Sequence, residues 1–93
     1  MRNGRRLTSP QLTLMYRNNT LGLPRFAFVV PMQVDKRAVG RNRIKRLLRE
    51  TVRGVLPQLS GIDGVIIARR GLVGLSLTEV ELRVKELLQP LMR

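Results

Sequence analysis

Apolar residues between positions 38 and 56 recur at the three- and four-residue spacing typical of a helix. At about 100° per residue they fill one arc of that helix, and basic or amide side chains fill the opposite arc. The apolar arc contains Ile44, Leu47, Leu48, Thr51, Val52 and Val55. The opposite arc contains Asn42, Arg46, Arg49 and Arg53, with Arg43 and Lys45 on its flanks. The pattern predicts an amphipathic helix from about Ala38 to about Leu56, which ends where Pro57 disfavours helical geometry in the residue before it.

Alternating patterns predict strands on both sides of this helix. Between residues 11 and 17, one face carries Leu12, Leu14 and Tyr16, and the other carries Thr13, Met15 and Arg17. A turn-forming segment, residues 18–24, leads to a second alternating run with Phe26, Phe28 and Val30, and we expect these two strands to pair antiparallel. The β-branched run from Gly64 to Ala68 predicts a buried strand. The first ten residues are expected either to be mobile or to form one short edge strand near Leu7.

Two capping signals place the ends of the helices. Asp35 is the expected N-cap of the first helix. Ser76 and Glu79 form an S-x-x-E capping box for a second helix, which Pro90 ends. Its apolar stripe, typical of core packing, contains Leu77, Val80, Val84, Leu87, Leu88 and Leu91. The pattern predicts one α+β domain over residues 1–93, a two-layer sandwich with a small mixed sheet of three to four strands and two helices on one face.

Charge narrows the range of partners. The 93 residues include 18 Lys or Arg and six Asp or Glu, for a net charge of +12. Eight of the basic residues, and only one acidic residue, lie between Lys36 and Arg53. Such clustering exceeds what solubility requires and favours a polyanionic partner, with nucleic acid as the leading candidate. Binding through these cations is expected to weaken steeply with salt.

The composition disfavours several kinds of catalytic and metal-binding chemistry. It has no cysteine and no histidine, so it lacks thiolate nucleophiles, zinc-finger ligands and the commonest general base. Its acidic residues are scattered singly, without the converging set that a two-metal nuclease requires. No apolar run approaches the roughly 20 residues that span a bilayer, and we expect a cytoplasmic protein. The amphipathic helix is not expected to lie on a membrane, because the core requires its apolar arc.

One motif points to a particular protein family, which its charge alone does not do. The run AVGRNRIKRLLRE, residues 38–50, contains Arg41-Asn42-Arg43 and resembles the RNR motif of the bacterial ribonuclease P protein component. The strand-like RFAFVV before it, DGVIIARRG after it and the Leu-rich helix at the end follow the order of that family. The resemblance covers almost the whole chain. It implies a protein that partners a catalytic RNA in an endonuclease that removes the 5′ leader from precursor tRNA.

The resemblance also implies partners and site residues. The partners are ribonuclease P RNA and precursor tRNA, with no obligate protein partner, and magnesium is expected to be held mainly by the RNA. We expect the chain itself to supply no catalytic residue and no metal site. The candidate RNA-binding residues are Lys36, Arg37, Arg41, Asn42, Arg43, Lys45, Arg46, Arg49 and Arg53. A groove for the single-stranded leader is expected on the sheet at Thr13, Met15 and Arg17.

At three points the pattern of the family conflicts with this sequence or with a general rule of protein structure. A connection between parallel strands through the first helix would ordinarily be right-handed, whereas the family implies a left-handed crossover. The family has an aromatic residue near the position of Met15, so leader stacking is expected to be weaker here. Family members usually begin with another helix beside the groove. The printed sequence begins near where that helix would end, so it either starts downstream of the natural start or is a shortened variant.

Two other classes of protein share this composition. A small structural ribosomal protein is equally basic and lacks catalytic residues, but nothing requires it to reproduce the RNR segment followed by a buried strand and a leucine-striped helix. A DNA-binding helix is the third option, since Asn and Arg read base edges in the major groove. Against it, the basic helix is followed by Pro57 and a strand rather than by helix-turn-helix spacing.

Overall fold

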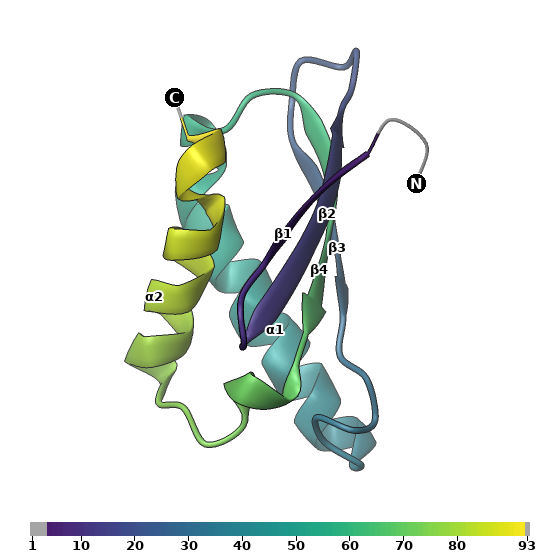
Figure 1. The fold of residues 1–93 in the computed structure, drawn as a ribbon, viewed down its shortest axis with the longest axis vertical. Helices are drawn as coiled ribbons and strands as arrows, with labels where there is room; N and C mark the ends of the chain where they lie inside the picture. The colour runs from purple at the N-terminus through teal and green to yellow at the C-terminus, as the bar shows by residue number, and fades with distance from the viewer. Residues whose placement is uncertain (1–3, 93) are drawn as a thin grey trace.

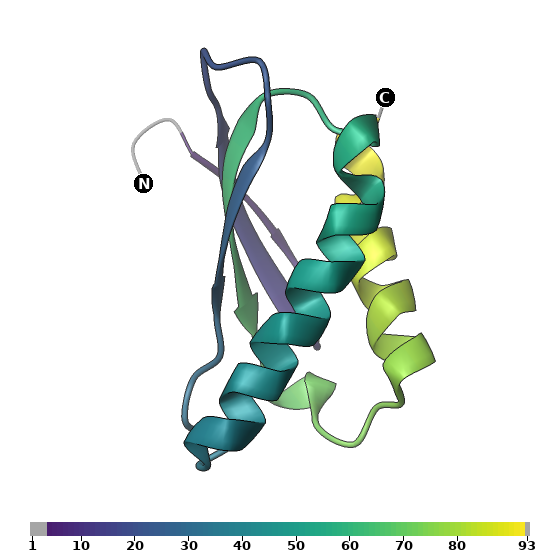
Figure 2. The same ribbon diagram turned by 180° about the vertical axis from the view of Figure 1, so that it is seen from behind.

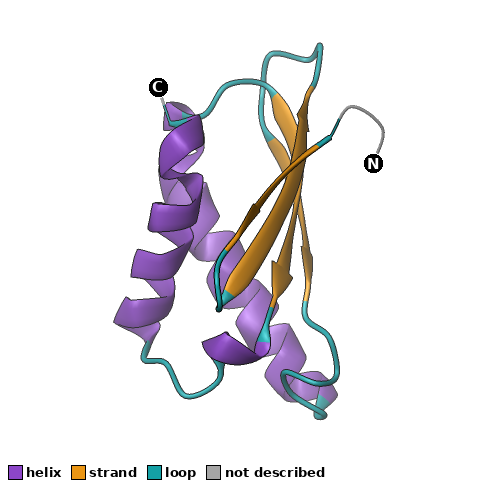
Figure 3. Ribbon diagram, viewed as in Figure 1, coloured by secondary structure: helices purple, strands orange, loops and turns teal. Residues whose placement is uncertain are grey.

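The strands form one mixed sheet, and both helices lie on the same face of it (Figures 1 and 2). The computed structural model describes residues 4–92. Its strands are β1 (Arg5–Thr8), β2 (Leu12–Asn18), β3 (Arg25–Val29) and β4 (Ile62–Ala68), and its α-helices are α1 (Ala38–Val55) and α2 (Leu77–Leu88). Short 3₁₀ turns follow at Leu56–Gln58, Arg70–Leu72 and Gln89–Leu91. The predicted two-layer α+β architecture is confirmed (Figure 3).

The strand order is β1-β2-β4-β3, so β4 lies between the two strands that we expected to pair. β2 pairs antiparallel with β4, with Leu14 opposite Ile66, and β3 pairs parallel with β4, with Phe26 opposite Gly64. The predicted antiparallel pairing of β2 with β3 is therefore wrong. The loop of residues 19–24 is long enough to cross the width of an intervening strand, about 10 Å. The run of Val65, Ile66 and Ile67 suits such a central position, because both edges of β4 are paired.

Because β3 and β4 are parallel, their connection through α1 is a βαβ crossover. Its expected left-handed course stays a prediction. α1 runs diagonally behind the sheet in Figure 1 and packs against α2 and β3. Within the described part of the chain, neither helix is long and apolar enough to cross a lipid bilayer.

The core fills the space between the sheet and the helices. The core is aliphatic. Because side chains alternate along a strand, Leu12, Leu14 and Ile66 point toward the helices, where they meet the apolar arcs of α1 and α2. The helical contribution to the core includes Leu48, Val52 and Val55 of α1 and Val80, Val84, Leu87 and Leu88 of α2. Tyr16, Phe26 and Phe28 are half-buried and pack against this core.

The two helices begin differently. At α2 the capping box is present: the Ser76 hydroxyl accepts the Glu79 N–H at 3.2 Å, and the Ser76 N–H reaches back to the Glu79 carboxylate. At α1 the N-cap is Arg37, which makes no side-chain cap, so the prediction that Asp35 is the N-cap is wrong. Asp35 lies two residues earlier, and its carboxylate accepts the Arg37 N–H instead. At the other end, α1 stops at Val55, one residue before the expected end, and the chain continues into the 3₁₀ turn that contains Pro57.

Candidate nucleic-acid interface

The basic arc of α1 faces away from the sheet, as the spacing predicts. Its apolar arc is buried at Leu48, Thr51, Val52 and Val55. The opposite arc is exposed at Asn42, Arg43, Arg46, Arg49 and Arg53, whereas Arg41 and Lys45 are half-buried. Lys36 and Arg37 lie just before the helix and are also exposed. The core therefore fixes the rotation of α1 about its axis, and this rotation leaves a row of cations on the surface.

The nine predicted RNA-binding residues differ in what their side chains already contact. Arg37 pairs with Asp35 at 3.2 Å, and Arg53 pairs with Glu50 at 3.5 Å. Arg41 donates to backbone carbonyls. Within residues 4–92, no hydrogen bond or ion pair holds the side chains of Lys36, Asn42, Arg43, Lys45 and Arg46. These five side chains can therefore bind a ligand without first breaking an internal hydrogen bond or ion pair.

Arg49 extends the basic face toward the edge of the sheet. Its guanidinium lies over the ring of Phe28 in β3, with 5.8 Å to the ring centroid, a distance at which cation–π attraction operates. The contact orients the guanidinium without neutralising its charge. β3 is an edge strand, so Arg49 continues the cationic surface of α1 onto the rim of the sheet.

The three residues predicted to line a leader groove lie on the open face of the sheet. Because β2 alternates, Thr13, Met15 and Arg17 point to the face opposite the helices. Met15 is half-exposed and Arg17 is exposed, but Thr13 is only 5% exposed, and its hydroxyl lies 3.1 Å from the Thr8 hydroxyl. Met15 and Arg17 therefore offer contact surface on this face, whereas Thr13 offers little.

Strand register also brings Arg6 to this face, which local sequence patterns did not reveal. Arg6 of β1 lies opposite Met15 in the ladder. A hollow of about 350 Å³ beside it also includes Thr13, Arg69 and Arg70. The Arg69 guanidinium is fixed there by the Thr8 hydroxyl at 3.0 Å and the Ser9 carbonyl at 2.7 Å. Only the pairing of β1 with β2 places Arg6 in this group, and no motif signals that pairing.

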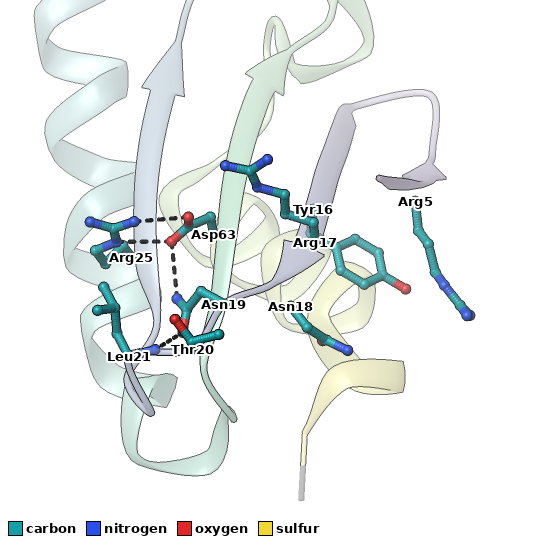
Figure 4. A pocket seen from close by; sticks show the side chains of 9 residues that line it. All are labelled: Arg5, Tyr16, Arg17, Asn18, Asn19, Thr20, Leu21, Arg25 and Asp63. Atoms are coloured by element: carbon teal, nitrogen blue, oxygen red, sulfur yellow. Dashed lines mark hydrogen bonds and ion pairs between the residues drawn. The ribbon is translucent and has the colours of Figure 1, made fainter. Parts of the chain in front are cut away.

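A second basic hollow, of about 630 Å³, lies at the end of the sheet where β2 turns toward β3 (Figure 4). Its wall contains an ion pair in which Arg25 Nε and Nη2 donate to the two oxygens of Asp63, each at 2.8 Å. Asn19 supports this pair, donating to Asp63 at 3.0 Å and to the carbonyl of Leu23 at 3.0 Å. These contacts tie the β2–β3 loop to β4.

This ion pair predicts a pH dependence of stability. Hydrogen bonds from Arg25 and then Asn19 lower the pKa of Asp63 from 3.8 to about 2. A lowered pKa in the folded state means that the stabilisation is complete above the unfolded value and is lost as pH falls from about 4 to about 2. We expect melting temperatures of the Asp63→Asn variant to fall less over this interval than those of the parent chain. Glu81→Gln is a suitable control, and equal slopes for all three proteins would contradict the prediction.

Within residues 4–92, the side chains that could bind a metal ion do not cluster. Among the described residues, no group of three or more Asp, Glu, His or Cys side chains is placed to hold one. The carboxylates of Asp35 and Asp63 are paired with Arg37 and Arg25 respectively. Part of the acidic charge is thus used internally.

The chain resembles known proteins in sequence along most of its length. A family model for ribonuclease P matches residues 1–92. The ribonuclease P protein component of Xanthomonas oryzae is 51% identical over 67 residues, which are 72% of this chain and 46% of that protein. The protein of the same name from Vibrio vulnificus is 45% identical over 75 residues, 81% of this chain and 64% of that protein. The chain thus spans about half to two thirds of the length of these relatives.

Solved structures share the fold of this chain. The ribonuclease P protein of Staphylococcus aureus superposes with a TM-score of 0.90 over 99% of this chain and 86% of that chain, at 21% identity. The protein from Thermotoga maritima gives 0.88 over 99% of this chain and 87% of that chain, at 25% identity. The family model over residues 1–92 and the sequence identity to these relatives show that this chain belongs to the ribonuclease P protein component family.

Proposed function

We propose that this chain acts as the protein subunit of ribonuclease P, binding ribonuclease P RNA and the 5′ leader of precursor tRNA to promote cleavage at the mature 5′ end. The observation that carries the proposal is the row of exposed cations on α1, held outward by the core in a member of this family. A net charge of +12 supports a polyanionic partner.

The residues of α1 have separate roles in this proposal. Arg43, Lys45 and Arg46 neutralise closely spaced phosphates of the RNA, and the arginines add bidentate geometry. Arg49, oriented by Phe28, binds phosphate at the rim of the sheet. Asn42 both donates and accepts hydrogen bonds, so it suits a sugar hydroxyl or a base edge better than a phosphate.

The leader lies along the open face of the sheet. Met15 gives it an apolar platform, while Arg17 and Arg6 bind its backbone. A thioether side chain packs against a base with less contact area than an aromatic ring, so binding here depends more on charge than on stacking. The leader is therefore held with little preference for its sequence.

The chain assists the reaction by binding and orienting, without a catalytic side chain of its own. Activation of the attacking water would come from magnesium held mainly by the RNA rather than by this chain. The cations of α1 and of the open sheet face reduce the phosphate repulsion between the catalytic RNA and its substrate. The need for high concentrations of magnesium as a counterion should fall accordingly.

Cleavage of precursor tRNA by a bacterial ribonuclease P RNA at low magnesium, with and without this chain, tests the proposal. We expect faster cleavage at the mature 5′ end when the chain is present. The Arg46→Ala/Arg49→Ala double variant, which is still strongly basic, controls for the general effect of a polycation. Binding of the RNA without any stimulation would contradict the proposal and indicate a structural RNA-binding protein.

A further inference from the structure

Hydrogen bonds hold the segment that joins β3 to α1 against the first turn of the helix. Val34 is buried, and its N–H donates to the Pro31 carbonyl at 3.0 Å. The Asp35 carboxylate then accepts the Arg37 N–H at 2.9 Å and two bonds from the Arg37 guanidinium, at 3.3 and 3.2 Å. These bonds fix the carboxylate in one orientation and lower the pKa of Asp35 below its ordinary value.

The carboxylate of Asp35 lies directly against the backbone of α1. Gly40 is buried in the first turn, and a Cβ atom at this position would overlap the Asp35 carboxylate. A side chain at residue 40 would therefore displace Asp35 from its bonds to Arg37. The absence of a side chain at Gly40 is what lets the preceding segment close onto the helix.

Arg41 makes the return contact, from the helix back to that segment. Its Nη1 donates to the Lys36 carbonyl at 2.8 Å and to the Asp35 carbonyl at 3.2 Å. Its own backbone N–H makes the helical bond to the Arg37 carbonyl at 3.0 Å. Arg41 is half-buried, whereas its neighbours Asn42 and Arg43 are exposed and have no such contacts in the described part of the chain.

We infer that Arg41 is a positioning residue rather than a phosphate ligand. Asp35, Gly40 and Arg41 form a clasp that fixes residues 31–37 against the first turn of α1. The clasp holds the start of the helix in one orientation, so that Asn42 and Arg43 point outward. Within the RNR triplet, the first arginine is then internal and the next two residues contact the ligand. The inference rests on the proposed function in taking RNA as that ligand.

Two measurements on two variants separate the roles of the arginines. The first is the salt dependence of binding to ribonuclease P RNA, and the second is amide hydrogen exchange at Arg37 and Arg41 in the free protein. For Arg41→Gln we expect an unchanged salt slope and exchange at least about tenfold faster at these amides. For Arg43→Gln, the matched control two residues away, we expect a slope smaller by about 1 and unchanged exchange.

The opposite result would overturn the inference: a slope smaller by about 1 for Arg41→Gln, with exchange as in the parent chain. Arg41→Lys is a milder second variant that keeps the charge but lacks the fixed fork of the guanidinium, and it should also accelerate exchange. If the parent chain bound no RNA, the proposed function would fail. Hydrogen exchange would still decide whether the clasp exists, so the two failures are distinguishable.

Discussion

Replacing Arg46 and Arg49 together with alanine is expected to weaken binding of ribonuclease P RNA about 100-fold at about 0.1 M salt. Each phosphate contact contributes about 0.9 to the slope of log affinity against log salt, which corresponds to about tenfold in affinity at that concentration. The slope should therefore fall by about 2. Titrations of the RNA at several salt concentrations measure both quantities.

Two features of the structure make Arg46 and Arg49 suitable residues for this test. Among the described residues, the side chains of Arg46 and Arg49 make no hydrogen bond or ion pair, and Arg49 lies over the ring of Phe28. Loss of the charges therefore leaves no buried group without a partner. Lys85→Ala removes a positive charge from α2 and should leave the slope as it is. An unchanged slope in the double variant would refute the role of these two arginines.

Gly40→Ala is expected to destabilise the fold although the residue lies within a helix. Alanine ordinarily favours a helix over glycine by about 1 kcal/mol. At residue 40, however, the added methyl group would overlap the Asp35 carboxylate, which its contacts with Arg37 hold in place. Overpacking of this kind costs about 1–3 kcal/mol, so the free energy of unfolding should fall. Denaturant titration measures the change.

Gly54→Ala is the matched control for this substitution. Gly54 lies in the same helix, and a Cβ atom there would meet nothing within 4 Å. Its free energy of unfolding should therefore rise by about 1 kcal/mol. In an Asp35→Ala background, the obstruction is gone and Gly40→Ala should become neutral or stabilising. Equal effects of the two glycine substitutions in the parent chain would show that Asp35 is not packed against the first turn.

The elements that local pattern determines were predictable from the sequence. The orientation of α1 follows from the spacing of Leu48, Thr51, Val52 and Val55, because a helix with one apolar arc must turn that arc to the core. The capping box at Ser76 follows from the same kind of local rule. The cationic surface of α1 was therefore predictable before its position relative to the sheet was known.

The features that depend on pairing between distant segments were not predictable. β4 enters the sheet between β2 and β3, and nothing within β2 or β3 records that a later strand will separate them. Arg6 reaches the open face only through its register with Met15. The internal bonds of Arg41 depend on where the chain turns before α1, whereas the sequence presents it simply as another cation in a basic run.

Tethered cleavage from single cysteines tests most directly whether the outward face of α1 meets the RNA. Because the sequence has no cysteine, one introduced cysteine carries the cleaving reagent at a unique position. Arg53→Cys places it on α1, where the replaced arginine already pairs with Glu50, and Leu82→Cys places it on an exposed part of α2. We predict strand cuts in ribonuclease P RNA from position 53 and none from position 82. Cuts from position 82 alone, or equal cuts from both, would contradict the assignment of α1 as the RNA-binding face.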